Sequence, residues 1–180
     1  VELIRAAFAR VGVAVDFVTV PFARCLLMAK TAQVAGCFNA TQTDDNRADY
    51  LWHSPPLFEE ELAIFGRATA QRRELTLSDL RGQRVAYTNG YTYPSEFLHD
   101  SRITKFSATS DAAQLRMLIS GRVDFVLLNR TPGSMRIAES AELRGQVVRR
   151  GRISMDSFWI AFSRQHPQGF GNSSGLVGHY

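Results

Sequence analysis

The sequence has no long apolar run and only two cysteines. A membrane-spanning helix needs about 20 consecutive apolar residues, so this sequence predicts no such span. Two cysteines are too few for a disulfide-rich scaffold. Cys25 and Cys37 could pair in an oxidising compartment, but each lies in a predicted apolar element, and we interpret them as two separate buried thiols. No secretory signal is visible, and because a removed targeting segment would leave the same appearance, the sequence does not assign a compartment directly.

Signatures of common catalytic and cofactor sites are also missing. The chain contains no nucleophile elbow, phosphate-binding loop or dinucleotide-binding fingerprint. Its histidines show no metal-ligand spacing with one another or with the cysteines, so structural or surface roles are favoured for them. They are His53, His99, His166 and His179. The sequence therefore predicts no catalytic residue, no metal and no cofactor.

Charge and composition are those of an ordinary globular chain. The net charge is +4, and the arginines are scattered apart from a cluster at Arg149, Arg150 and Arg152. That pattern gives no support for a nucleic-acid face, and we predict no nucleic-acid partner. A mildly positive protein could favour anionic or zwitterionic small ligands, or simply have a solvated surface. A length of 180 residues with 45% hydrophobic residues suits one large domain or two small lobes.

A helix–turn–strand phrase occurs twice and predicts two related lobes. The first copy runs from Leu26 to Phe38 and the second from Leu115 to Leu127. In each, a Leu-x-Met step lies on a helix, a small residue ends that helix, and a valine opens a buried strand. Ligands of open α/β sheets bind beyond the carboxyl ends of the strands. Function is therefore expected in the two segments that follow these strands, 39–43 and 129–131.

Hydrophobic spacing and turn residues predict alternating helices and strands along the whole chain. Helices are expected at 2–11, 22–30 and 131–139, after caps at Thr43 and Ser110, and around Pro94, with a helical turn at 78–80. Strands are expected at 15–20, 36–39, 62–66, 84–88, 104–107, 123–128, 147–149 and 158–162. The alternation indicates an α/β fold with parallel sheets and helical crossovers. No strand precedes the first helix, and a polar, flexible tail is expected at 169–175.

An ordered set of phrases then resembles a known family. The phrases are Asp16–Arg24, with a strand and a Pro-aromatic helix start, then Thr43–Tyr50, Ser54–Leu57, Leu77–Ala86, Gly90–Tyr93 and Leu118–Asp124. In this order and spacing they resemble the bacterial extracellular solute-binding proteins of family 3. These are periplasmic receptors that deliver polar amino acids and similar solutes to ABC importers. The resemblance covers nearly all of residues 1–166.

The resemblance implies a two-lobed, type II periplasmic-binding-protein-like α/β fold whose lobes are joined by two crossover strands. Lobe one would comprise residues 1–60 and 160–180, and lobe two residues 61–159. The implied function is the substrate-binding component of an ABC importer, which holds a small polar, carboxylate-bearing solute in the cleft between the lobes. The implied partners are that ligand and a membrane permease. The protein would be a periplasmic monomer, or an extracellular lipoprotein anchored to a membrane.

Site residues are carried over position by position. Arg47 would hold the carboxylate of the ligand in two parallel hydrogen bonds, although its spacing equally favours a surface pair with Asp44 or Asp45. The other ligand contacts implied are Asn39, Thr41, Gln42 and the apolar wall Phe22 from lobe one, and Thr92, Tyr93 and Ser110 from lobe two. Arg24 could face the cleft or the solvent.

The chain departs from the family pattern at two informative positions. Amino-acid-binding members often place an aspartate at the end of the second-copy strand to hold the ligand's ammonium group, and Asn129 stands there. This leaves the identity of the ligand open. Ala35 replaces an aspartate usual in the first copy, whereas Asp124 keeps it in the second. Two alternatives also stay open: a cyclohexadienyl dehydratase-like enzyme on the same scaffold, and the ligand-sensing module of a receptor.

Overall fold

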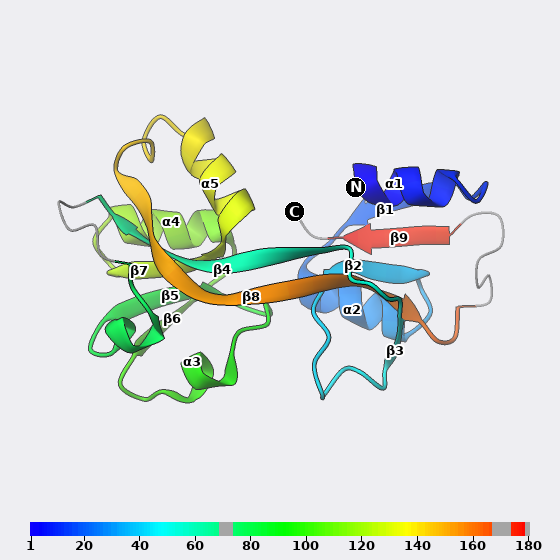
Figure 1. Cartoon of the computed structure of the whole chain (residues 1–180), viewed down its shortest axis with the longest axis horizontal. Helices are drawn as coiled ribbons and strands as arrows, with labels where there is room; N and C mark the ends of the chain where they lie inside the picture. Colours follow the sequence, from blue (N-terminus) through cyan, green and yellow to red (C-terminus); the bar gives the residue numbers. More distant parts are fainter. Residues whose placement is uncertain (69–73, 167–173, 179–180) are drawn as a thin grey trace. The chain divides into compact units, whose positions relative to one another are not determined.

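The protein, described by a computed structural model, consists of two compact units (Figure 1). The structure describes residues 1–68, 74–166 and 174–178. Unit 1 is formed by Val1–Glu59 and Ser157–Tyr180, and unit 2 by Glu60–Asp156. Strands β4 (Phe58–Arg67) and β8 (Val147–Ser163) carry the chain across these boundaries. The boundaries expected from the sequence fall at residues 60 and 160.

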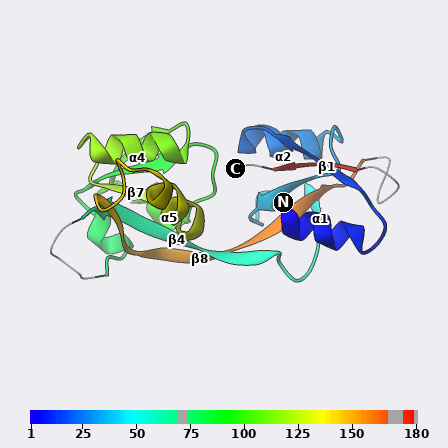
Figure 2. The same cartoon turned by 90° about the horizontal axis from the view of Figure 1, so that it is seen from above.

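Unit 1 has a mixed sheet with one helix on each face (Figure 2). Its elements are α1 (Glu2–Ala9), β1 (Val15–Thr19), α2 (Phe22–Lys30), β2 (Gly36–Ala40), β3 (Tyr50–Trp52), the second part of β8, and β9 (Ser174–Gly178). The strand order is β1-β9-β2-β8, with β3 paired to β8. Because successive side chains of a strand alternate between faces, Cys37 packs with Ala29 of α2 while Phe38 packs with Ile4 of α1.

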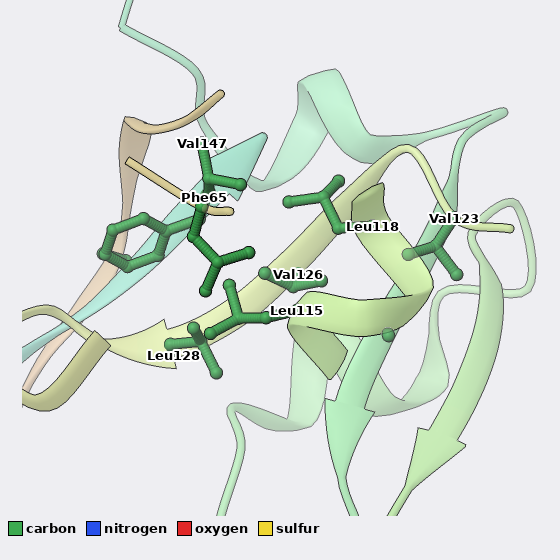
Figure 3. Close-up of a cluster of buried hydrophobic side chains, with 10 residues drawn as sticks. Phe65, Leu115, Leu118, Val123, Val126, Leu128 and Val147 are labelled. Carbon is green, nitrogen blue, oxygen red and sulfur yellow. The ribbon is translucent and has the colours of Figure 1, made fainter. Parts of the chain in front are cut away.

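Unit 2 has the sheet order β4-β7-β5-β6. Its elements are β4, the 3-10 turn η1 (Leu77–Leu80), β5 (Arg84–Thr88), α3 (Ser95–His99), β6 (Thr104–Ala108), α4 (Asp111–Ile119), β7 (Phe125–Asn129), α5 (Arg130–Glu139) and the first part of β8. Val126 and Leu128 of β7 pack against Leu115 of α4 (Figure 3). Leu127 between them packs on the opposite face, beside Phe97 of α3. Both faces of β7 are covered, which accounts for its uninterrupted apolar sequence.

The predicted α/β fold is confirmed, but the sheets are mixed rather than parallel. Strands β5, β6 and β7 run parallel as expected. Strands β4 and β7 are antiparallel, as are β2 and β3 with β8. The strands that cross between the units therefore run against their neighbours. Helical crossovers predict only parallel pairing. They do not predict the antiparallel pairing of β4 with β7 or of β8 with β2 and β3, because no single helix connects these pairs of strands.

Two expected short strands are parts of one long strand. Residues 147–149 and 158–162 both belong to β8, which has 17 residues. In the stretch between them, only Ile153 to Asp156 alternate between apolar and polar residues. Its extended form follows from strand pairing that a local pattern does not encode, since β8 is the neighbour of both β2 and β4.

The expected polar tail also contains a strand. Residues Ser174–Gly178 form β9, which pairs in parallel with β1 and with β2. The remainder of the predicted tail, residues 169–173, lies outside the described part of the chain. A segment from the far end of the sequence thus supplies the neighbour that β1 lacks locally.

The interpretation of the two cysteines as separate thiols is wrong. Cys25 of α2 and Cys37 of β2 form a disulfide, with their Cα atoms 5.6 Å apart. Helix α2 packs directly over β2, and this brings the two residues within the Cα distance that a disulfide requires. The sequence gives their separation along the chain, but not this distance across the helix–sheet interface.

Candidate functional site

In unit 1, the predicted site segment begins where β2 ends. Asn39 has a backbone φ of 59°, a left-handed conformation that asparagine tolerates better than most residues. The register between β2 and β8 shifts at this point, between Phe38 and Ala40. Pairing resumes beyond the shift, between Ala40 and Trp159, and the loop of residues 41–49 follows. Asn39 lies near the end of β2, and Thr41 and Gln42 begin the loop. All three side chains are half-buried.

The helix expected after Thr43 is absent, and residues 44–49 form consecutive turns instead. Asn46 organises this loop: its Oδ1 accepts the Thr43 N–H at 2.8 Å, and its Nδ2 donates to the Thr41 carbonyl at 2.9 Å. These side-chain bonds compete with the backbone bonds of a helix. Asn46 is not among the site residues predicted from the sequence. The signal available was the Thr-x-x-Asn spacing, which is typical of side-chain-supported turns.

Arg47 lies in these turns with 64% of its side chain exposed. Its Nη2 is 3.3 Å from Asp44 Oδ1, and Asp44 is 95% exposed. This is the surface pair that the sequence left open as an alternative to ligand binding. Ion pairs as exposed as this one contribute little to stability. The guanidinium is therefore held only weakly where the structure places it.

Thr41 and Phe22 have less accessible positions in unit 1. The Oγ1 of Thr41 is buried, and it has no hydrogen-bond partner among the described residues. Buried hydroxyls are nearly always hydrogen-bonded in folded proteins, so Thr41 departs from the usual pattern among the described residues. Phe22, the first residue of α2, is half-buried against the cluster that contains the disulfide.

In unit 2, the segment after β5 divides into exposed and buried residues. Gly90 has a φ of 83° and turns the chain, and Thr92 is exposed. Tyr93 is only 6% exposed, and its hydroxyl accepts the Thr88 N–H at 2.9 Å. Burial raises the pKa of Tyr93, which keeps its hydroxyl neutral. The structure therefore places Tyr93 in the core, beside Phe97, with its hydroxyl already bonded to the backbone.

Ser110 and Asn129 lie at the starts of two helices of unit 2. The Oγ of Ser110 accepts the Ala113 N–H at 3.2 Å and so caps α4, as the sequence predicts. Asn129 is the last residue of β7 and precedes α5, and its side chain makes no capping bond. It is half-buried. The Ser110 hydroxyl thus has a structural partner, and the Asn129 amide is not used as a cap.

A hydrogen-bonded polar chain that the sequence analysis missed joins α4 to β5 and β7. Thr88 Oγ1 donates to Asp111 Oδ1 at 2.7 Å, and Gln114 Nε2 donates to Thr88 Oγ1 at 2.8 Å. The amide of Gln114 also donates to the Leu127 carbonyl at 3.1 Å and accepts the Leu127 N–H at 3.2 Å. Gln114 is fully buried. A buried glutamine in an otherwise apolar helix stripe was the signal available in the sequence.

Tyr91 lies beside this polar chain. Its pKa is raised, first by burial and then by the negative charge of Asp111, whereas Arg136 acts in the opposite direction. Asp111 is half-buried in the first turn of α4. The carboxylate of Asp111 and the ring of Tyr91 therefore lie near the end of β5. The amide of Asn129 lies at the end of β7.

A hollow in unit 2 lies elsewhere, between α4 and α5. Its volume is about 370 Å³. It is lined by Leu115, Arg116, Ile119, Arg136, Glu139 and Leu143, among others. None of the predicted site residues lines it, so it gives no support to those predictions.

Within residues 1–68, 74–166 and 174–178, no group of three or more potential metal ligands occurs. His53 Nδ1 lies 2.8 Å from the Pro55 carbonyl, and its Nε2 accepts the Ile160 N–H at 3.0 Å. His99 Nδ1 lies 2.9 Å from the Ser95 carbonyl. His179 lies outside the described residues. In that same part of the chain, no helix is long and apolar enough to cross a membrane.

Comparison with known proteins shows the fold. No protein-family model matches the chain, and no curated protein matches it in sequence. Among solved structures it is similar to holo ArgBP from T. maritima, with 22% identity, a TM-score of 0.77, and coverage of 91% of this chain and 71% of that one. It is also similar to the substrate-binding protein of an amino acid ABC transporter, with 11% identity, a TM-score of 0.74, and coverage of 91% and 72%.

A third similar structure is a histidine kinase sensor domain with similarity to periplasmic binding proteins. It has 24% identity, a TM-score of 0.77, and coverage of 91% of this chain and 71% of that one. Together these similarities assign the α/β fold of the type II periplasmic binding proteins. Fold alone does not assign a ligand. The structural neighbours named are binding proteins and a sensor domain rather than enzymes.

Proposed function

We propose that this protein is the substrate-binding component of an ABC importer, and that it binds a small polar solute with a carboxylate group. The observation that carries the proposal is the loop after β2. It combines the buried, unpartnered hydroxyl of Thr41 with the weakly held guanidinium of Arg47. The type II binding-protein fold supports it, since similar structures include a substrate-binding protein of this transporter class.

In this proposal, Arg47 exchanges its pair with Asp44 for the carboxylate of the ligand. The exchange costs little because the existing pair is exposed. A guanidinium can hold a carboxylate in two parallel, charge-assisted bonds, which are stronger when water is excluded. Further contacts in unit 1 are Thr41, Asn39, Gln42 and the ring of Phe22.

Unit 2 contributes the second set of contacts in this proposal. The polar groups of unit 2 offered to a ligand are those of Thr92, Ser110 and Asn129, and Tyr93 supports the segment from within the core. The partner of the ligand-bound protein in this proposal is a membrane permease. The protein acts as a monomer in this proposal and has no nucleic-acid partner.

The experiment is calorimetric titration after a thermal-shift screen of amino acids, dicarboxylates and amines. Substitution Arg47→Ala is expected to weaken binding of a carboxylate ligand by about 2–5 kcal/mol if the pair becomes buried. Arg10→Ala, an exposed arginine of the same unit outside the predicted site, is the matched control and should leave affinity unchanged. Equal affinities for wild type and Arg47→Ala would remove Arg47 from the site.

We further propose a periplasmic location, or an extracellular one with a lipid anchor. The Cys25–Cys37 disulfide supports this, because such bonds persist in oxidising compartments and are rare in a reducing cytosol. Thiol-alkylation of protein taken directly from cells, without reductant, tests it. Labelling of both cysteines would contradict this location.

A second candidate is the ligand-sensing module of a receptor. The specific observation in its favour is the similarity to a histidine kinase sensor domain. Co-purification of the native protein separates the two candidates: a permease partner supports the importer, and a kinase partner supports the sensor. The dehydratase-like alternative requires turnover of a prephenate-like substrate, which an absorbance assay would reveal.

A further inference from the structure

We propose that Asn46 is a positioning residue, which fixes the backbone of Arg47 so that the guanidinium is in place before a ligand arrives. This inference rests on the proposed function and deepens it, because it names a residue that sets the affinity of the same site. Asn46 acts through the loop and through Arg47, and it does not contact the ligand itself.

The side chain of Asn46 ties the first half of the loop together. Its Oδ1 accepts the Thr43 N–H at 2.8 Å, and the Asn46 N–H donates to Thr43 Oγ1 at 3.3 Å. These reciprocal bonds have the pattern of a capping box, although turns follow instead of a helix. The Asn46 Nδ2 also donates to the Thr41 carbonyl at 2.9 Å. One half-buried amide therefore holds the backbone at two points before Arg47.

Both polar backbone groups of Arg47 have a partner. Its N–H donates to the Thr43 carbonyl at 2.9 Å, and its carbonyl accepts the indole N–H of Trp52 at 3.2 Å. The indole is packed in turn, since its ring lies edge-on to Tyr50 with centroids 5.8 Å apart, and edge-on to Trp159 at 6.3 Å. The main chain of Arg47 is therefore anchored to an aromatic cluster of unit 1.

The far end of the loop is tied to α2. The ammonium group of Lys30 donates to Asp49 Oδ2 at 2.7 Å. The hydroxyl of the buried Tyr50 donates to the Leu26 carbonyl at 2.9 Å. The loop is thus attached to the rest of unit 1 at its end, and Asn46 supplies the attachment at its start.

The side chain of Arg47 contrasts with its backbone. It is 64% exposed, and its ion pair is with the exposed Asp44. Ordering a loop on binding lowers affinity, and a loop that is already ordered leaves only one side chain to be immobilised. Without the Asn46 amide, the Thr43 N–H and the Thr41 carbonyl lose their partner, and the ligand has to order the loop as well as the guanidinium.

The first test needs no ligand, because the chain has only two tryptophans, Trp52 and Trp159. In a Trp159→Phe background, Trp52 is the single tryptophan and still has an aromatic ring beside it. Asn46→Ala is expected to increase the quenching of Trp52 emission by acrylamide, because a looser loop exposes the indole. Gln33→Ala is the matched control: this exposed amide of the same unit bonds to Thr31, and its removal should leave quenching unchanged. Equal quenching in Asn46→Ala and its parent would overturn the inference.

The second test is a double-mutant cycle in calorimetry with L-arginine as titrant, or with glutarate where wild type does not bind L-arginine. Asn46→Ala is expected to weaken binding about tenfold, the cost of ordering the loop. In an Arg47→Ala background the same substitution should cost little more, because residues that act through one another are not additive. A general effect on folding would instead lower affinity equally in both backgrounds. Thermal melting of each variant verifies that it is folded.

The outcomes separate this inference from the function on which it rests. If Asn46→Ala binds the titrant as wild type does, or loses the same affinity in both backgrounds, the positioning role is wrong and carboxylate binding by Arg47 stands. If wild type binds neither titrant and the broader screen finds no carboxylate ligand, the proposed function itself fails. The quenching measurement then decides by itself whether Asn46 fixes the loop.

Discussion

In both copies of the helix–strand phrase, the residue before the leucine links the helix to the sheet. The kind of bond differs between the two copies. In the first copy, Cys25 precedes Leu26 and forms the disulfide to β2. In the second copy, Gln114 precedes Leu115 and bonds with both polar backbone groups of Leu127 on β7. Both side chains are fully buried. The comparison teaches that the same helical position can be linked to the sheet by a covalent bond or by an amide.

The turns that end the two helices are alike, although their sequences differ. Ala32 has a φ of 59° and Gly121 a φ of 73°. The Gln33 N–H bonds to the Met28 carbonyl at 2.9 Å, and the Arg122 N–H bonds to the Met117 carbonyl at 3.0 Å. Such left-handed helix endings satisfy the last carbonyls of a helix. The shared geometry supports the interpretation of the phrase as a repeat.

Removing the amide link should have the largest effect. The pairing of β5 with β7 ends at Ala86 and Val126. On the side that faces β5, the N–H and the carbonyl of Leu127 therefore bond to the side chain of Gln114 instead. Gln114→Leu leaves these groups buried and unpaired, and we expect it to lower the free energy of unfolding by about 3 kcal/mol or more. Urea unfolding followed by circular dichroism measures this. Gln33→Leu, at an exposed position, is the control and should change stability by less than about 0.5 kcal/mol.

Removing the covalent link should have the next largest effect. Cys25 and Cys37 are 12 positions apart, and closing a loop of that size is worth about 2–3 kcal/mol. The double substitution Cys25→Ala with Cys37→Ala is expected to lower the melting temperature in the absence of reductant. Wild type in reductant should approach the same value. Equal melting temperatures for wild type with and without reductant would contradict a stabilising disulfide.

Exchanging the residues at the two helix endings should produce smaller changes of opposite sign. A left-handed conformation costs a non-glycine residue about 1 kcal/mol, so Gly121→Ala is expected to destabilise unit 2 by about 1 kcal/mol. A Cβ at Gly121 would meet no atom within 4 Å, and the loss would therefore be due to backbone strain alone. Ala32→Gly should stabilise unit 1 by about 0.5 kcal/mol, since flexibility gained in the unfolded chain offsets part of the relief. Chemical denaturation of the two variants is the measurement, and changes of the same sign would argue against equivalent turns.

An effect of similar, small size is expected just before the strands, where Asp124 and Ala35 occupy matching places. Arg84 bonds to Asp124 through its side chain at 2.7 and 3.0 Å and through its N–H at 2.9 Å. The hydrogen bonds from Arg84 lower the pKa of Asp124. Because the folded pKa is below the unfolded one, this stabilisation is present at neutral pH and is lost as the pH falls through the folded pKa.

Asp124→Ala is therefore expected to cost about 0.5–1 kcal/mol at pH 7, as for a partly exposed ion pair. The difference from wild type should narrow once the pH falls below about 4, where aspartate begins to protonate. Urea unfolding at both pH values is the measurement. A penalty that does not change with pH would assign the loss to packing rather than to charge.

The helices and strands that depend on local pattern could be predicted from the sequence. The bounds of α2 are those expected from its apolar spacing, and β5 likewise extends from Arg84 to Thr88 as predicted. Long-range pairing could not be predicted, because it depends on which segments meet in space. Strand β9 and the continuity of β8 are of this kind.

The candidate site shows the same limit at the level of side chains. Ser110 could be recognised as a cap from its neighbours alone. The bond from Thr88 to Asp111 joins residues 23 positions apart, and no local pattern indicates it. The placement of Tyr93 in the core depends on Phe97 and Tyr87 closing around it. The ligand contacts assigned to Arg47, Asn39 and the other site residues stay predictions.

The division of the chain also has a consequence for biosynthesis. Unit 2 is one continuous segment, Glu60–Asp156, whereas unit 1 needs residues from both ends of the sequence. Once residue 156 has emerged from the ribosome, all of unit 2 has been synthesised. Unit 1 still lacks the second half of β8 and the strand β9 at that point. Domains generally fold as units during synthesis. Unit 2 can therefore complete its sheet before the later strands of unit 1 have been synthesised.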